Sequence, residues 1–163
     1  MSKRLFLTIF ISVTAVGVWA GGPSTFDAVM EHYEPIRDAL INDSMDGVNA
    51  HGTAIAAELR KLQSDFSSDR AGASGEAATV VREKLPEMIS AADEIATAKT
   101  LEVARDGLYD LSKPMVRWRE GVVESGRPAV AYCPMHKRSW LQPDEEIGNP
   151  YGGMPRGGEI VSK

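Results

Sequence analysis

Three residues that can bind soft metal ions lie within four positions of one another in the C-terminal part of this sequence. The segment "AYCPMHKRSW", residues 131–140, contains Cys133, Met135 and His136, and Cys133 is the only cysteine of the 163 residues. Thiolate and thioether ligands favour Cu(I) and similar ions, whereas imidazole suits copper and zinc. Residues i and i+3 of an extended or turning segment can lie on the same side, so Cys133 and His136 could share one ion.

Two or three ligands in one loop do not complete a closed site, so another ligand would have to come from elsewhere in the chain. Met154, in "YGGMPRGG", is the natural candidate, and His32 and His51 in the N-terminal half are further candidates. For His51, which lies among small residues, we favour a packing role.

Other interpretations of the segment remain open. A lone cysteine is usually a small buried hydrophobic residue, and a methionine near an aromatic residue usually fills a gap. The spacing is not that of a c-type haem attachment, which needs two cysteines before the histidine. Cys133 and His136 could be a nucleophile and its base, but no orienting third group is evident. We therefore expect no enzymatic activity and no catalytic residue.

The first 20 residues have the pattern of a secretory signal peptide. Lys3 and Arg4 precede a short apolar run that ends in Val18-Trp19-Ala20, with small residues at the positions that a signal peptidase reads. We expect cleavage before Gly21, which leaves one domain of about 140 residues over 21–163 in the periplasm or outside the cell. In such oxidising compartments an unpaired cysteine indicates a metal ligand, a reactive thiol or an intermolecular disulfide.

Charge excludes two classes of partner. The formal net charge is −5, and loss of Lys3 and Arg4 with the leader makes it −7. Nucleic-acid binding needs a concentrated basic face, and binding to anionic lipid needs a polybasic stripe. We therefore expect no nucleic-acid partner, no membrane contact after cleavage, and a monomer or a homodimer.

Helical periodicity dominates the chain between residues 24 and 125. Apolar residues recur every three or four positions from Phe26 to Leu40, with Ser24 and Thr25 as candidate N-caps. Ser44 is the candidate cap of a second helix, and residues 63–76 read as a long polar loop. The predicted helices after the first cover residues 45–62, about 77–97 and about 100–123.

Four amphipathic segments joined by modest loops predict an all-α fold, an antiparallel four-helix bundle. Residues 126–163 are rich in proline, glycine and aromatic residues and lack helical periodicity. We expect this segment to be an irregular tail packed on the helical core of residues 24–125, with "NPYGG" as a turn that places Tyr151 and Met154 on the bundle.

The tail resembles a known C-terminal signature. "YCPMHKRSWLQPDEEIGNPYGGMPRGGEIV", residues 132–161, is similar to the end of a family of exported bacterial domains of unknown function, some fused to periplasmic adaptor subunits of copper/silver efflux systems. "EHYEPIRDALINDS" and "LYDLSKPMV" fit the same family. The resemblance implies that Cys133, Met135 and His136 form a first ligand loop and that Met154 belongs to a second. The family usually has a cysteine where this chain has Gly157, so a second thiolate or a disulfide partner is missing.

Together these features predict a periplasmic, non-enzymatic protein that binds copper as Cu(I), or Ag(I) by analogy, and no other cofactor. Its metal ligands would be Cys133, Met135, His136 and Met154, and its role would be storage or delivery to an efflux or metal-trafficking partner. The alternative is a helical scaffold that recognises a protein partner and has a purely structural tail.

Overall fold

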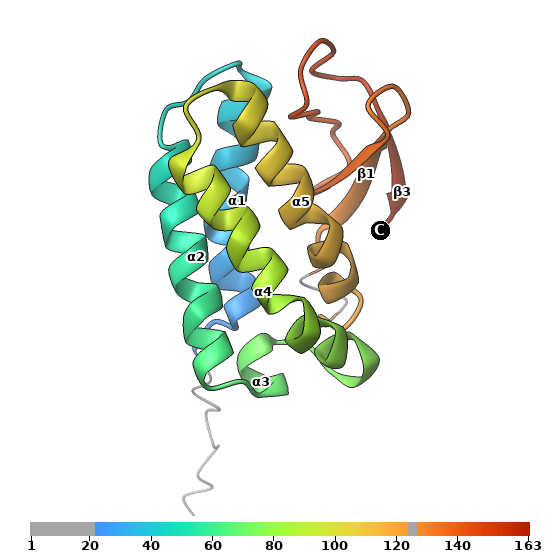
Figure 1. Cartoon of the computed structure of the whole chain (residues 1–163). Helices are drawn as coiled ribbons and strands as arrows, with labels where there is room; N and C mark the ends of the chain where they lie inside the picture. The colour runs from blue at the N-terminus through green and yellow to red at the C-terminus, as the bar shows by residue number, and fades with distance from the viewer. Residues whose placement is uncertain (1–21, 124–126) are drawn as a thin grey trace, which may run out of the picture.

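The computed structural model describes residues 22–123 and 127–163, so the leader predicted over residues 1–20 lies outside the described residues. Five helices are followed by three strands (Figure 1). The helices are α1 (Thr25–Ile41), α2 (Val48–Ser64), α3 (Ser68–Ala71), α4 (Gly75–Thr97) and α5 (Leu101–Arg119), and the strands are β1 (Ala129–Cys133), β2 (Arg138–Gln142) and β3 (Glu159–Ser162). Within the described residues, none of the helices has the length and apolar character needed to span a membrane.

The starts of the first two helices differ in how well the sequence predicts them. Ser24 caps α1 through a capping box, in which its side chain and that of Asp27 each accept from the other's backbone N–H. Ser44 does not cap α2, because the helix begins four residues later, at Val48, and Gly47 occupies its N-cap position. Gly47 has a φ of 74°, a left-handed conformation that glycine adopts without a steric penalty. The Ser44 hydroxyl instead accepts from the Asp46 backbone N–H.

The polar segment predicted as a loop contains the short helix α3. Ser67 caps it by accepting from the Arg70 backbone N–H, and Gly72 ends it in the left-handed conformation. Pro35, Pro86 and Pro114 all lie inside continuous helices, although proline is unfavourable in a helix interior.

The long helices pack side by side in the order α1, α2, α4, α5, and α5 also contacts α1 (Figure 1). Two glycines let α4 approach both of its neighbours closely. A Cβ at Gly52 of α2 would lie 2.7 Å from the Ala96 backbone nitrogen, and one at Gly107 of α5 would lie 2.8 Å from the Ile95 side chain. The fold is mostly helical, as the periodicity predicts.

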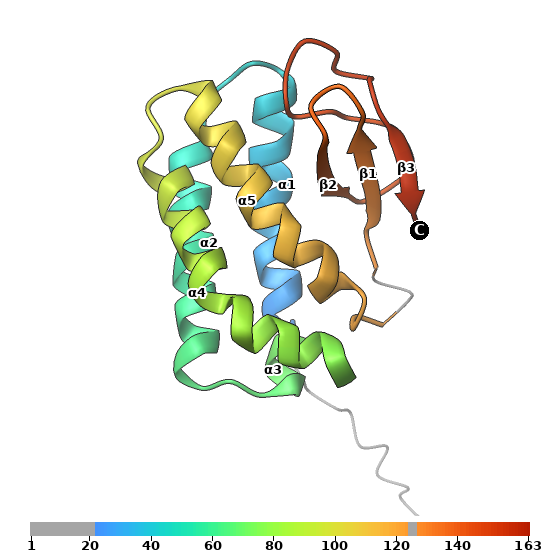
Figure 2. The ribbon, with the colours of Figure 1, turned by 45° about the vertical axis from the view of Figure 1, so that its right-hand side comes forward.

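The prediction of an all-α fold with an irregular tail is wrong, because the tail contains a three-stranded antiparallel sheet of order β2-β1-β3 (Figure 2). β1 pairs with β2 from Ala129↔Gln142 to Cys133↔Arg138, and with β3 through Tyr132↔Glu159. The strands were hard to detect because β2 has three consecutive buried residues instead of an alternating pattern, and β3 is a short, largely exposed edge strand.

The sheet shares the core of the helices. Val130 and Leu141 belong to the same buried apolar cluster as the helical residues, and α5 packs against β2. The buried Tyr33 hydroxyl of α1 bonds to Ser112 Oγ of α5 at 2.7 Å and accepts from the Leu141 backbone N–H at 3.2 Å. Burial raises the pKa of Tyr33 to about 12, so this hydroxyl stays neutral and keeps its proton for the hydrogen bond.

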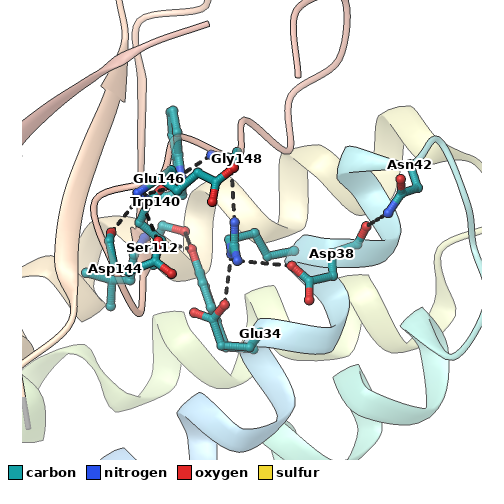
Figure 3. Close-up of polar contacts among 12 residues, drawn as sticks. Glu34, Asp38, Asn42, Ser112, Trp140, Asp144, Glu146 and Gly148 are labelled. Atoms are coloured by element: carbon teal, nitrogen blue, oxygen red, sulfur yellow. Dashed lines mark hydrogen bonds and ion pairs between the residues drawn. The ribbon is translucent and has the colours of Figure 1, made fainter. Parts of the chain in front are cut away.

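A second polar connection fixes the loop after β2. Arg37 of α1 donates from its Nε to Glu34, pairs with Asp38 and donates to the Gly148 carbonyl oxygen (Figure 3). Gln142 closes the same loop by donating to the carbonyl oxygens of Asp144 and Glu146. The chain that leads from the sheet to Tyr151 is thereby held against α1.

Candidate metal centre

The β1–β2 hairpin brings Cys133 and His136 together. Cys133 is the last residue of β1 and pairs with Arg138, so the connection has only four residues, Pro134 to Lys137. Lys137 has a φ of 54°, the left-handed conformation that closes such short connections. As a result, Cys133 Sγ lies 3.2 Å from His136 Nδ1. We call these two residues the hairpin pair.

The hairpin pair lies at the boundary between a small apolar cluster and solvent. Cys133 is 1% exposed and packs with Ala131, Trp140 and Tyr151, whereas His136 is exposed. The His136 ring centroid lies 6.5 Å from that of Tyr151. The imidazole therefore lies on the solvent side of a buried thiol, where it can move without repacking the core.

The two predicted thioether ligands lie toward solvent. Met135 is 71% exposed and Met154 is 44% exposed. Met154 begins a turn closed by a hydrogen bond from the Gly157 backbone N–H to its carbonyl oxygen, and its side chain lies over Gly157. Of the four predicted ligands, the structure brings the cysteine and the histidine into contact and leaves both methionines at the surface.

Gly157, where the resemblance implies a second cysteine, lies two residues before the start of β3. The pairing of β1 with β3 ends at Tyr132↔Glu159, and Gly158 directly precedes that pair in the chain. Gly158 fits this close approach, because a Cβ there would lie 2.9 Å from the Tyr132 carbonyl oxygen.

Residues that the sequence analysis did not select hold the site in place. Arg138 pairs with Asp106 of α5 at 2.6 Å, and its guanidinium lies 5.0 Å from the Tyr109 ring centroid and 5.4 Å from that of Tyr151. Burial raises the pKa of Tyr151 well above its ordinary value, and its hydroxyl donates to the Ser139 carbonyl oxygen. The position of Arg138 directly after "CPMHK" was the sequence feature that could have indicated its role in holding the hairpin.

Asn149 closes the segment that carries Tyr151 and Met154. It is 1% exposed, its amide donates to the Gly157 carbonyl oxygen at 2.7 Å, and its side-chain oxygen accepts from the Tyr151 backbone N–H. Tyr151 lies against Tyr109 of α5, with ring centroids 6.2 Å apart. The turn predicted from "NPYGG" therefore places Tyr151 on the helices, while Met154 stays exposed.

The chemistry available at the hairpin pair is two-point binding of a soft or borderline ion. In the parts of the chain that the structure describes, no three His, Cys, Asp or Glu side chains cluster closely enough to hold a metal ion together. Sulfur and nitrogen ligands at zinc-like bond lengths and a tetrahedral angle are about 3.6 Å apart. The 3.2 Å contact would need to open by only a few tenths of an ångström.

The fold and the site define a class: a mostly helical domain whose small sheet carries a cysteine–histidine hairpin. The family model described as "Protein of unknown function (DUF3347)" matches residues 29–125. This is more than half of the 163 residues, and the chain therefore belongs to this family of proteins of unknown function. The matched residues cover the helices, and the hairpin pair and Met154 lie beyond them. Searches of curated proteins and of solved structures gave no match.

Proposed function

We propose that this protein binds Cu(I), or the chemically similar Ag(I), at the hairpin pair and stores the ion or hands it on without catalysing a reaction. The contact between Cys133 Sγ and His136 Nδ1 carries this proposal, because thiolate and imidazole together favour copper-type ions. Met135 and Met154 are the proposed additional ligands. Both are exposed and flexible, so each can turn toward the ion without disturbing the core.

Binding would proceed by ligand exchange. The Cys133 thiol loses its proton to solvent as the sulfur–metal bond forms, and neutral His136 supplies its Nδ1 lone pair. The ion keeps its oxidation state throughout. Because only two protein ligands are in contact and one of them is exposed, an incoming ligand from a partner can replace His136 or a methionine first. Such a site suits transfer better than permanent retention.

The proposed setting is the periplasm or the outside of the cell, after removal of the leader at residues 1–20. The support is the signal-peptide pattern and the resemblance of residues 132–161 to exported domains that accompany copper/silver efflux adaptors. The proposed partner is a periplasmic efflux or metal-trafficking protein.

A second candidate function is a helical scaffold with a structural tail. The observation that favours it is the burial of Cys133, which is 1% exposed within a cluster of apolar and aromatic side chains. In that case the thiol is a packing residue, and the surface of the helices recognises a protein partner.

Anaerobic titration of the reduced protein with Cu(I), in competition with a chelator of known affinity, separates the two functions. The metal-binding function predicts one tight ion per chain, loss of that binding in Cys133→Ser, at least tenfold weaker binding in His136→Ala and a smaller loss in Met154→Leu. Met45→Leu, on the helical side of the molecule, is the matched control and should bind like the wild type. Equal binding in the wild type and Cys133→Ser would leave the scaffold as the function.

A further inference from the structure

Two histidines from different helices meet away from the hairpin pair. His32 of α1 and His51 of α2 place their Nδ1 atoms 3.1 Å apart, with ring centroids 5.3 Å apart. Both side chains are half-buried. Their contact lies between α1 and α2, whereas Cys133 packs in the cluster beside α5. We call His32 and His51 the histidine pair.

The two imidazole rings are placed for a hydrogen bond between their Nδ1 atoms, and a small movement would let both nitrogens bind one metal ion. The distance between the two ring centroids is close to the Nδ1–Nδ1 distance plus the radii of the two rings. The two Nδ1 atoms therefore lie nearly on the line between the ring centres, and one nitrogen donates a hydrogen bond to the other. Two imidazole nitrogens on one tetrahedral ion, at bonds of about 2.0–2.1 Å, are about 3.3 Å apart. To bind an ion, the two Nδ1 atoms must therefore move apart by about 0.2 Å and each imidazole ring must rotate modestly. The χ2 torsion of histidine has a broad energy minimum, so this rotation costs little.

The helix faces around the histidine pair carry no charged side chain next to either ring. The positions three and four residues away on the same helix faces are uncharged: they are Ala28, Val29, Pro35, Ile36, Gly47, Val48, Ala54 and Ile55. A third protein ligand is absent from the described residues, since no three His, Cys, Asp or Glu side chains cluster there. Water would complete the coordination sphere on the exposed side of the pair.

We propose that His32 and His51 form a second metal site, which binds a borderline divalent ion such as Zn²⁺ or Cu²⁺ and links α1 to α2. Imidazole ligands suit these ions, whereas Cu(I) at the hairpin pair depends on the thiol. Binding replaces the hydrogen bond between the two Nδ1 atoms. The donating imidazole moves its proton from Nδ1 to Nε2 by exchange with solvent, so both neutral rings present an Nδ1 lone pair to the ion and no net proton is released. This site does not depend on the proposed function of the hairpin pair.

The test uses Cys133→Ser as the background, so that the thiol contributes nothing. Titration with Zn²⁺ at pH 7.5 should show one ion per chain, with the melting temperature rising by about 5–10 °C at saturating metal because the ion binds only the folded helix pair. His32→Gln and His51→Gln should each lower Zn²⁺ affinity at least tenfold, while the exposed Thr53→Ala on α2 should not change it.

A measurement on unaltered histidines guards against variants that fail to fold. Electron paramagnetic resonance of the Cu²⁺ complex in the Cys133→Ser background should show coupling to two imidazole nitrogens. Coupling to one nitrogen or none, or Zn²⁺ affinity that is equal in His32→Gln and its parent, would overturn the second site. Loss of Cu(I) binding in Cys133→Ser tests only the hairpin pair, so the two proposals fail separately.

Discussion

At the scale of single residues, Glu34 is the carboxylate whose ionisation is most closely tied to folding. Its Oε2 accepts from Arg37 Nε at 2.9 Å, while its Oε1 is buried and has no hydrogen-bond partner within the described residues (Figure 3). Burial raises the pKa of Glu34 above its ordinary value, and the charge of Arg37 only partly offsets this effect. The folded protein therefore holds a proton on Glu34 more tightly than the unfolded chain does.

This difference between the folded and unfolded pKa of Glu34 determines how the stability of the protein changes with pH. Because the folded-state pKa is the higher one, the contribution of Glu34 to stability is fully present below its unfolded pKa and is lost as the pH rises through its folded pKa. We predict that the free energy of unfolding of Glu34→Gln increases relative to that of the wild type as the pH rises from about 4 to 7. Urea unfolding across that range measures it, with the exposed Glu31→Gln as the control. A constant difference between wild type and Glu34→Gln would contradict the prediction.

Residue chemistry was partly predictable from the sequence. The spacing of Cys133 and His136 indicated that both could lie on the same side of an extended or turning segment. The hairpin that brings them into contact was not predicted. The exposure of Met135 and Met154 was not predictable. It depends for Met135 on how the hairpin connection projects from the sheet, and for Met154 on how the turn that ends at Gly157 lies on the surface. The contact between His32 and His51 depends on how α1 and α2 pack, which no local pattern encodes.

At the scale of secondary-structure elements, Gly52 and Gly107 allow α4 to pack closely between α2 and α5. A Cβ at Gly52 would lie 2.7 Å from the Ala96 backbone nitrogen and 2.8 Å from an Ile95 methyl group. The obstacle at Gly52 includes helix backbone, which cannot move as a flexible side chain can. The glycine is therefore required although it weakens the helix by about 1 kcal/mol relative to alanine.

We predict that Gly52→Ala lowers the free energy of unfolding by about 1–3 kcal/mol, because overpacking outweighs the gain in helix propensity. Chemical denaturation measures the change. Thr53→Ala, at the next and exposed position of α2, is the matched control and should be neutral or slightly stabilising. An increase in stability for Gly52→Ala would show that α2 and α4 are not packed as closely as described.

Elements were predictable where local chemistry decides their limits. Ser24, one of the two candidate N-caps, marks the start of α1, and apolar periodicity marked the bodies of the long helices. The start of α2 was missed because a left-handed glycine, Gly47, sets it in place of a side-chain cap. β2 was missed because tertiary packing buries three consecutive residues, so its sequence does not alternate, and β3 was missed because it is a short, largely exposed edge strand.

At the scale of the whole molecule, the helices and the sheet share one core, and we predict that they unfold as one cooperative unit. Val130 and Leu141 extend the helical core into the sheet, and Tyr33 bonds to both α5 and β2. The two buried tryptophans report on the two parts: Trp118 donates to the Ala71 carbonyl oxygen among the helices, and Trp140 donates to Gln142 in the sheet.

Single-tryptophan variants test this unity. In a Trp19→Phe background, Trp118→Phe retains the Trp140 signal and Trp140→Phe retains the Trp118 signal. Because each substitution also removes core packing, the two variants are not compared with each other. Within each variant, the urea transition measured by fluorescence should coincide with the one measured by circular dichroism. A Trp140 transition at lower urea than the helical transition of the same protein would show that the sheet unfolds separately.

We propose that Cys133 and His136 bind one soft ion together. X-ray absorption at the copper edge of the one-to-one Cu(I) complex tests this proposal, because it identifies the atoms bound to the ion. We predict a first shell that contains both sulfur and imidazole nitrogen, with the imidazole contribution lost in His136→Ala and the thiolate contribution lost in Cys133→Ser. A first shell without sulfur, or the same spectrum for the wild type and Cys133→Ser, would contradict the claim and leave Cys133 as a packing residue of the sheet.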